Sequence, residues 1–263
     1  MLGAMTGDIV GSLYEFNNHR SKEFELFGKG CCFTDDTVMT VAVMQALLYG
    51  ARGGDAELSA QFVRQMRTLG REYPDSGYGI RFSSWLFSEE PKPYNSFGNG
   101  SAMRVSPCGF YADTLEEAVH LARLSAEVTH NHPEGVKGAE VTAGAVFLAR
   151  TGADKAEIRR FVEEKGYNLQ FTLDEIRETY SFNETCQDTV PQAVVAFLES
   201  SDFEDAIRCA ISVGGDSDTL AAITGGIAEA FYGIPKYIKE KTLSYLPEDL
   251  RQITENFYRA ITE

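Results

Sequence analysis

The sequence predicts an all-α fold, a single compact bundle of roughly ten or more helices that forms one domain over residues 1–263. Apolar residues recur at helical spacing in most segments, as Leu58, Phe62, Met66 and Leu69 do. No run of residues alternates between apolar and polar as it would in a half-buried strand. Because no fixed-period repeat and no interdomain linker divides the chain, we expect one domain.

Capping residues, prolines and glycines mark the ends of the expected helices. Glutamates three residues after Thr114, Asp154 and Thr172 predict capping boxes, and Thr34 and Asp202 precede apolar segments as N-caps do. The expected helices cover residues 3–14, 34–49, 55–70 and 80–87, segments beginning at 114, 134, 154, 172, 191, 202 and 217, and two closing segments opened by Pro235 and Pro247. Apart from 80–87, regularity fails over residues 74–109, and long ordered loops of this kind are often functional.

The composition excludes some classes of partner. The formal net charge of −15 argues against general binding to nucleic acid or anionic membranes, which depends on Lys and Arg side chains. The most apolar long window, residues 38–49, is too short to span a bilayer. Five cysteines without a Cys-x-x-Cys pair favour reduced thiols over a disulfide framework or a zinc site. With no basic segment at the N-terminus to indicate a signal peptide, we expect a cytoplasmic protein.

Two oxygen-rich helix starts stand far apart in the chain. Thr34-Asp35-Asp36-Thr37 and Asp216-Ser217-Asp218-Thr219, the latter after two glycines, each precede an apolar segment. A helix needs only one N-cap residue, so each start carries more oxygen atoms than capping requires. One interpretation is two well-capped helices. The other is a shared site for hard cations such as Mg²⁺ or Mn²⁺, which prefer carboxylate and hydroxyl oxygens.

The spacing of these residues does not favour a single chelated ion. Asp35 and Asp36 point in directions about 100° apart around a helix, so they suit two metals, or a metal and a water molecule. Asp216, Asp218 and Thr219 are able to close the site from the opposite side. Metal pairs in such sites lie roughly 3.5–4 Å apart.

Glu15 is expected at the end of the first helix, where its charge opposes the negative end of the helix dipole. A nearby cation would cancel that penalty, whereas the alternative is an exposed glutamate on a fraying turn. No case arises for a Ser-His-Asp or Cys-His nucleophile.

The segment 97–104 ends the irregular region. Glycines expose backbone N–H groups that can hold phosphate oxygens, although Asn99-Gly100 is also a common turn. Arg104 either pairs internally or binds a ligand. His132, in the loop 129–133, either forms a structural hydrogen bond or contacts a ligand phosphate or ribose.

These segments together resemble the ADP-ribosylglycohydrolase family, which includes the dinitrogenase reductase-activating glycohydrolases and the ADP-ribosyl-acceptor hydrolases. The matching segments are 3–15, 33–37, 98–104 and 214–219, in the family's order. The resemblance implies an orthogonal multi-helix bundle with a dinuclear Mg²⁺ or Mn²⁺ centre. The implied metal ligands are Thr34, Asp35, Asp36, Asp216, Asp218 and Thr219, and the implied substrate-binding residues are Phe97, Gly98, Asn99, Gly100, Ser101, Met103 and His132. The expected catalytic residue is Glu15 or Asp36, with Glu15 preferred as the base that directs the attacking water.

The implied reaction is hydrolysis of the glycosidic bond at C1″ of an ADP-ribose conjugate, with release of ADP-ribose. Glu15 matches a glutamate of the serine-type members and favours O-linked substrates. Arginine, serine, a nucleobase, acetyl or a poly-ADP-ribose chain remain open as acceptors. The alternatives are a non-catalytic ADP-ribose-binding module, a structural protein on the same scaffold, and a metal-dependent phosphatase.

Overall fold

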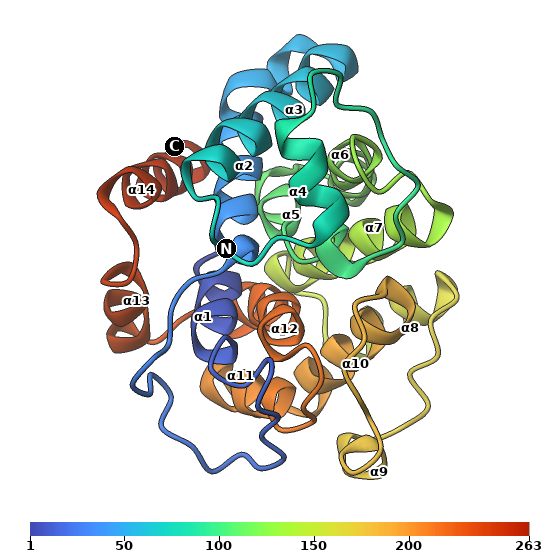
Figure 1. Ribbon diagram of the computed structural model, residues 1–263. Coiled ribbons are helices and arrows are strands. Elements are labelled where there is room, and N and C mark those ends of the chain that lie inside the picture. Colours follow the sequence, from blue (N-terminus) through green and yellow to red (C-terminus); the bar gives the residue numbers. More distant parts are fainter. Residues whose placement is uncertain (263) are drawn as a thin grey trace.

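The computed structural model describes residues 1–262, which form helices joined by turns and loops and contain no β-strand beyond one isolated bridge (Figure 1). The all-α prediction is therefore confirmed. The α-helices are α1 (Leu2–Gly11), α2 (Asp35–Gly50), α3 (Asp55–Glu72), α4 (Ile80–Phe87), α5 (Ser106–Tyr111), α6 (Leu115–Glu127), α7 (Pro133–Arg150), α8 (Lys155–Glu164), α9 (Leu173–Ile176), α10 (Cys186–Glu199), α11 (Phe203–Ile211), α12 (Ser217–Tyr232), α13 (Lys236–Leu243) and α14 (Glu248–Thr262), and the 3₁₀ turns are η1 (Ala51–Gly53) and η2 (Asn99–Ser101). None of the helices over residues 1–262 is both long and apolar enough to cross a membrane.

Most helix starts follow the predicted caps. Thr34, Asp154, Thr172 and Asp202 each accept a backbone N–H from the first turn of the following helix. The capping boxes at Asp154 and Thr172 are complete. The third predicted box is only half formed: the Thr114 hydroxyl accepts the N–H of Glu117, but the Glu117 carboxylate accepts the N–H of Asp113 instead of that of Thr114.

Two helix boundaries, the end of α1 and the start of α10, differ from the prediction. Helix α1 ends at Gly11, because the Ser12 hydroxyl donates to the Ile9 carbonyl and the chain then turns; Glu15 therefore lies beyond the helix, and the expected conflict with its dipole does not arise. Helix α10 begins at Cys186, so Pro191 lies inside the helix and does not open it. The turn before Pro191 is held by bonds from Cys186 to the loop around Gly98, which outweigh the missing proline N–H. Helix α5, unforeseen in the irregular region, has Pro107 in its first turn.

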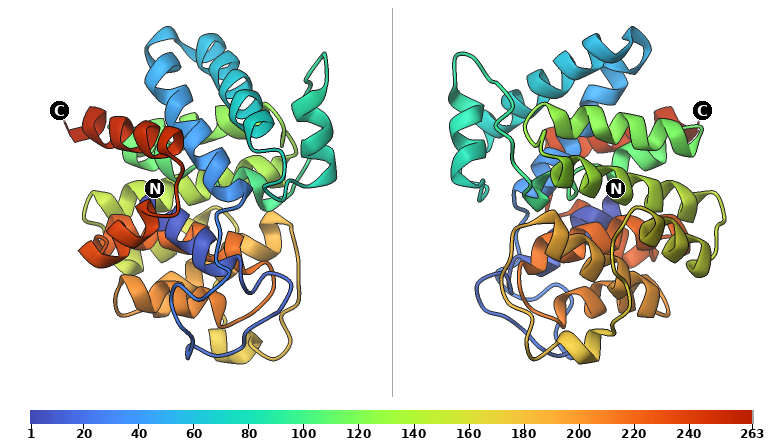
Figure 2. Two further views of the ribbon diagram at one scale, coloured as in Figure 1. Left: turned by 60° about the vertical axis from the view of Figure 1, so that its left-hand side comes forward. Right: turned by 90° about the vertical axis from the view of Figure 1, so that its right-hand side faces the viewer.

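Helices α1 and α12 cross at backbone contact. A Cβ atom on Gly3 would lie 2.1 Å from the carbonyl oxygen of Gly225, and one on Gly7 would lie 2.0 Å from that of Ala221. Glycine is required at both positions because no side-chain atom fits between the helices. Figures 1 and 2 show the two helices side by side, with the chain that follows α1 close to the start of α12.

Two clusters of buried apolar side chains fill the interior. One lies around α2, α3, α5 and α6, and the other around α8, α10, α11 and α12. Helices α1 and α7 contribute side chains to both, so the packing is continuous between them. That residues 1–263 form one domain stays a prediction. All five cysteines are free thiols.

The α1–α12 crossing predicts that Gly7→Ala destabilises the protein. The added methyl group must push the helices apart, and overpacking of this kind costs about 1–3 kcal/mol or more. Gly79→Ala is the matched control, because a Cβ there meets no atom within 4 Å and the φ of Gly79 is −56°. The measurement is the free energy of unfolding in urea; equal stability of the two variants would contradict the crossing.

Candidate metal centre and active site

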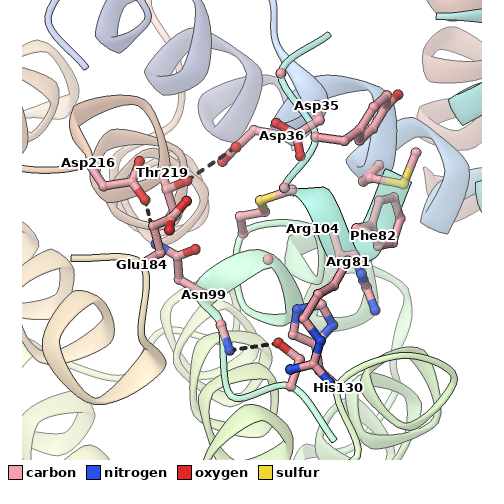
Figure 3. A pocket seen from close by; sticks show the side chains of 18 of the residues that line it. Asp35, Asp36, Arg81, Phe82, Asn99, Arg104, His130, Glu184, Asp216 and Thr219 are labelled. Atoms are coloured by element: carbon pink, nitrogen blue, oxygen red, sulfur yellow. Dashed lines mark hydrogen bonds between the residues drawn. The ribbon is translucent and has the colours of Figure 1, made fainter. Parts of the chain in front are cut away.

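One cavity of about 490 Å³ collects the two acidic helix starts and the glycine segment (Figure 3). Its walls come from the bend after α1, the N-termini of α2 and α12, the segment around η2 and the N-terminal half of α4. The predicted site residues in the lining are Glu15, Asp35, Asp36, Gly98, Asn99, Gly100, Met103, Asp216, Asp218 and Thr219. Segments as far apart in the sequence as Glu15 and Thr219 therefore meet at one place.

Three carboxylates from two parts of this lining, the bend after α1 and the start of α12, approach one another. Glu15, Asp216 and Asp218 each offer an oxygen atom, and these atoms all lie within 4.8 Å of one another. The Thr219 hydroxyl donates to Oδ2 of Asp36 at 3.2 Å, which links the start of α12 to the start of α2 (Figure 3). Oδ1 of Asp36 is buried and has no hydrogen-bond partner. An all-oxygen donor set with an unpaired buried carboxylate oxygen fits a hard divalent cation.

Local backbone geometry aims the carboxylates. Gly214 and Gly215 have φ angles of +73° and +77°, a left-handed conformation that turns the chain sharply from α11 into Asp216. Thr34 caps α2 through its side chain and leaves Asp35 and Asp36 in the first turn. Negative groups in a first turn are stabilised by the positive end of the helix dipole.

The cavity carries an excess of acidic groups. Six carboxylates line it: those of Glu15, Asp35, Asp36, Glu184, Asp216 and Asp218. Among residues 1–262, none of the six forms an ion pair with a basic side chain.

Burial is the main cause of the raised pKa values in this group. It raises the pKa of Asp35, Asp36 and Asp218 well above the usual range, and neighbouring carboxylates reinforce the shift. The pKa of Glu15 is raised to about 7, first by burial and then by the charges of Asp216 and other acids. Two divalent cations would offset this repulsion.

The two arginines that line the cavity already have partners in the protein. Arg104 is 1% exposed, and its Nη2 donates to the Ser125 carbonyl at 2.7 Å and to the Thr129 hydroxyl at 2.9 Å, so it is paired internally. Arg81 is exposed, donates to the carbonyl of Tyr94 and lies over the ring of that residue.

Asp8 is a buried carboxylate that is not among the predicted site residues. It accepts the backbone N–H groups of Thr34 and Thr37 and the hydroxyl groups of both. The Thr34 hydroxyl donates to Oδ1 of Asp8 at 2.7 Å, and its oxygen accepts the N–H of Asp36 at 3.4 Å, so one lone pair of that oxygen is left for a cation. The available signal was a single acid among apolar and small residues in the first helix.

Several predicted site residues lie outside the cavity lining. The Ser101 hydroxyl is buried beneath the loop and donates to the carbonyls of Gly135, at 2.7 Å, and Gly98. Phe97 lines a smaller adjoining pocket. His132 caps α7, with Nδ1 accepting the N–H of Glu134, and packs against Phe97. The histidine that lines the cavity is instead His130, which is 5% exposed. Thr34 is not part of the lining, and its hydroxyl donates to the carboxylate of Asp8.

The raised pKa values predict how the stability of the metal-free protein depends on pH. Carboxyl groups whose pKa rises on folding from about 4 add stability at low pH, and that contribution is lost as the pH rises through the raised value, about 7 for Glu15. We expect Mg²⁺ or Mn²⁺ to raise the melting temperature more at pH 8 than at pH 5.5. Asp218→Asn should shrink this difference. An equal shift at both pH values, or none, would contradict the description of the site.

Comparison with known proteins places the chain in one family. The sequence profile described as ADP-ribosylglycohydrolase matches residues 1–263. The chain is 26% identical over 333 residues to the ADP-ribosylhydrolase ARH3 of Homo sapiens, covering 98% of this chain and 88% of the relative. It is 28% identical over 296 residues to the ADP-ribosylarginine hydrolase Tri1 of Pseudomonas putida, covering 99% and 77%.

A solved structure supports the same assignment. The chain of an ADP-ribosylglycohydrolase-related protein complex superposes with a TM-score of 0.69 at 25% identity, covering 98% of this chain and 96% of that one. The predicted fold class and the resemblance noted in the sequence are thereby confirmed. This protein belongs to the ADP-ribosylglycohydrolase family and is a glycohydrolase enzyme.

Proposed function

We propose that this enzyme is a Mg²⁺- or Mn²⁺-dependent hydrolase that cleaves the glycosidic bond at C1″ of ADP-ribose conjugates and releases ADP-ribose. Membership of the family and the printed activities of the relatives support this substrate class. The observation that carries the proposal is the meeting of both acidic helix starts and the glycine segment in one cavity.

Two metal ions would be held by Asp35 and Asp36 from α2 and by Asp216, Asp218 and Thr219 from α12. Thr34, whose hydroxyl donates to Asp8 behind the lining, is the remaining proposed ligand. When bound, the ions would supply the positive charge that the carboxylates require and orient the hydroxyl groups of the ribose. The protein's own contribution is to hold these oxygen atoms in place and to line the rest of the chamber.

The glycine segment would face the anionic part of the substrate, but with fewer backbone donors than its sequence implies. The N–H of Gly98 already donates to the Ser96 hydroxyl at 3.1 Å, and that of Asn99 donates to the Glu184 carbonyl at 2.7 Å. His130 lies beside this segment: its Nε2 would be in van der Waals contact, at 3.5 and 3.4 Å, with Cβ atoms placed on Gly98 and Gly100. We assign contact with the ligand to Gly98 and Gly100 because both line the cavity.

Glu15 is the candidate general base. It is partly buried, lines the cavity and lies within 4.8 Å of Asp216 and Asp218. Asp36 is the weaker candidate, because its Oδ2 accepts the Thr219 hydroxyl and is committed to the link between the helix starts. Glycosidic cleavage passes through an oxocarbenium-like state, which the surrounding carboxylates would stabilise. Glu15 would take the proton of the attacking water molecule.

The acceptor group is a separate question. We propose an O-linked acceptor on the basis of Glu15. The relatives include one named for ADP-ribosylarginine, so an N-linked acceptor is the direct competitor.

A panel of ADP-ribosylated acceptors, incubated with Mg²⁺, with Mn²⁺ or with EDTA, tests the activity. We expect release of free ADP-ribose from the O-linked member with either metal and none in EDTA. Binding without release would indicate an ADP-ribose-binding module. Release of inorganic phosphate would indicate a phosphatase, and either result would overturn the proposed reaction.

The role of Glu15 predicts a separation of binding from turnover. Glu15→Gln should retain ADP-ribose affinity, measured by calorimetry, and lose about 10²–10⁴-fold in turnover. Glu23→Gln, an exposed position in the same loop, is the matched control and should keep full activity. Normal turnover of Glu15→Gln would remove Glu15 from the mechanism.

A further inference from the structure

We propose that Asn99 is a positioning residue for the metal centre: its side-chain amide holds the ligand Asp216 in place and ties it to the glycine loop. This inference rests on the metal site of the proposed function and extends it to a residue whose expected role was contact with substrate.

The contacts of Asn99 are direct and buried. Asn99 is 6% exposed, and its Nδ2 donates to Oδ2 of Asp216 at 2.7 Å and to the Thr189 hydroxyl at 3.1 Å (Figure 3). Thr189 is fully buried, and its own hydroxyl proton goes to the carbonyl of Asn183 at 3.2 Å. Both acceptors therefore require the NH₂ group of the amide to face them, which fixes its orientation.

Asp216 is not held by the helix that it precedes. It stands at the N-cap position of α12, but its side chain accepts no N–H from the first turn, in contrast to Thr34 at the start of α2. Its backbone follows two glycines in left-handed conformation, which by themselves leave the chain with much freedom. The amide of Asn99 supplies the side-chain restraint that the helix does not.

The loop that carries Asn99 is fastened to the start of α10. The N–H of Asn99 donates to the Glu184 carbonyl at 2.7 Å, and the N–H of Cys186 donates to the Phe97 carbonyl at 3.0 Å. The Cys186 thiol also donates to the Gly98 carbonyl at 3.1 Å. These bonds hold the Asn99 backbone in place, and its side-chain amide therefore reaches Asp216 from a fixed position.

A neutral donor suits this position. The amide occupies one oxygen of Asp216 and leaves the other oxygen and the full negative charge available for a cation. An Arg or Lys in the same place would cancel that charge. Outer groups that orient metal ligands typically contribute 10–100-fold to metal affinity.

The test measures Mn²⁺ affinity by electron paramagnetic resonance, on the full chain without substrate. Asn99→Ala should weaken Mn²⁺ binding about 10–100-fold. Thr189→Val, which removes only the second partner of the amide, should weaken it less. Asn131→Ala is the matched control, because it also removes an asparagine side chain, but one that accepts the N–H of Asn95 at 2.8 Å and does not line the cavity. It should bind Mn²⁺ as the wild type does.

Two further comparisons give each outcome a meaning. If the wild type binds Mn²⁺ and Asp216→Asn does not, unchanged affinity of Asn99→Ala overturns this inference alone. If Asp216→Asn binds Mn²⁺ as tightly as the wild type, the metal site itself is wrong. Near-ultraviolet circular dichroism checks that each variant is folded. Should Asn99→Ala fail that check, Thr189→Val decides: wild-type affinity contradicts the inference, and weaker binding supports it.

Discussion

Repulsion between buried carboxylates is the constraint on which the rest of this structure depends. Six acids line one cavity without a basic side chain paired to any of them within residues 1–262, and burial raises the pKa of several. Such an arrangement is unfavourable unless cations are bound. The surrounding protein holds it together nonetheless, through the glycine crossing of α1 on α12, the four donor groups of Thr34 and Thr37 that bond Asp8, and the amide of Asn99. A cation site requires both properties: carboxylates that repel one another when no cation is bound, and surrounding contacts that keep them in place.

The two acidic helix starts were predictable because their signals are local. Caps, first-turn acids and paired glycines act within a few residues, and the structure shows them largely where expected. The partners of these starts were not predictable in the same way. Asp8 acts on Thr34 across 26 residues, and Asn99 acts on Asp216 across 117. Local sequence patterns do not predict contacts between residues so far apart in the chain.

Long-range contacts also explain why some helix boundaries and site residues differ from the prediction. Pro191 has the local features of a helix start, but contacts between Cys186 and the Gly98 loop extend the helix before it. His130 and His132 differ by two positions in one loop, and only the packing of α7 decides that His132 caps a helix while His130 lines the cavity. Glu15 was singled out by a dipole argument that fails, since α1 ends at Gly11, yet its place beside Asp216 and Asp218 supports the role assigned to it through the family resemblance.

The central claim is that the two acidic helix starts form one dinuclear metal centre. Anomalous diffraction from crystals soaked in Mn²⁺ tests it most directly. We expect two anomalous peaks in the cavity, roughly 3.5–4 Å apart, between Asp35 and Asp36 on one side and Asp216, Asp218 and Thr219 on the other. Peaks only elsewhere on the protein, or a well-ordered cavity without a peak at saturating Mn²⁺, would contradict the account.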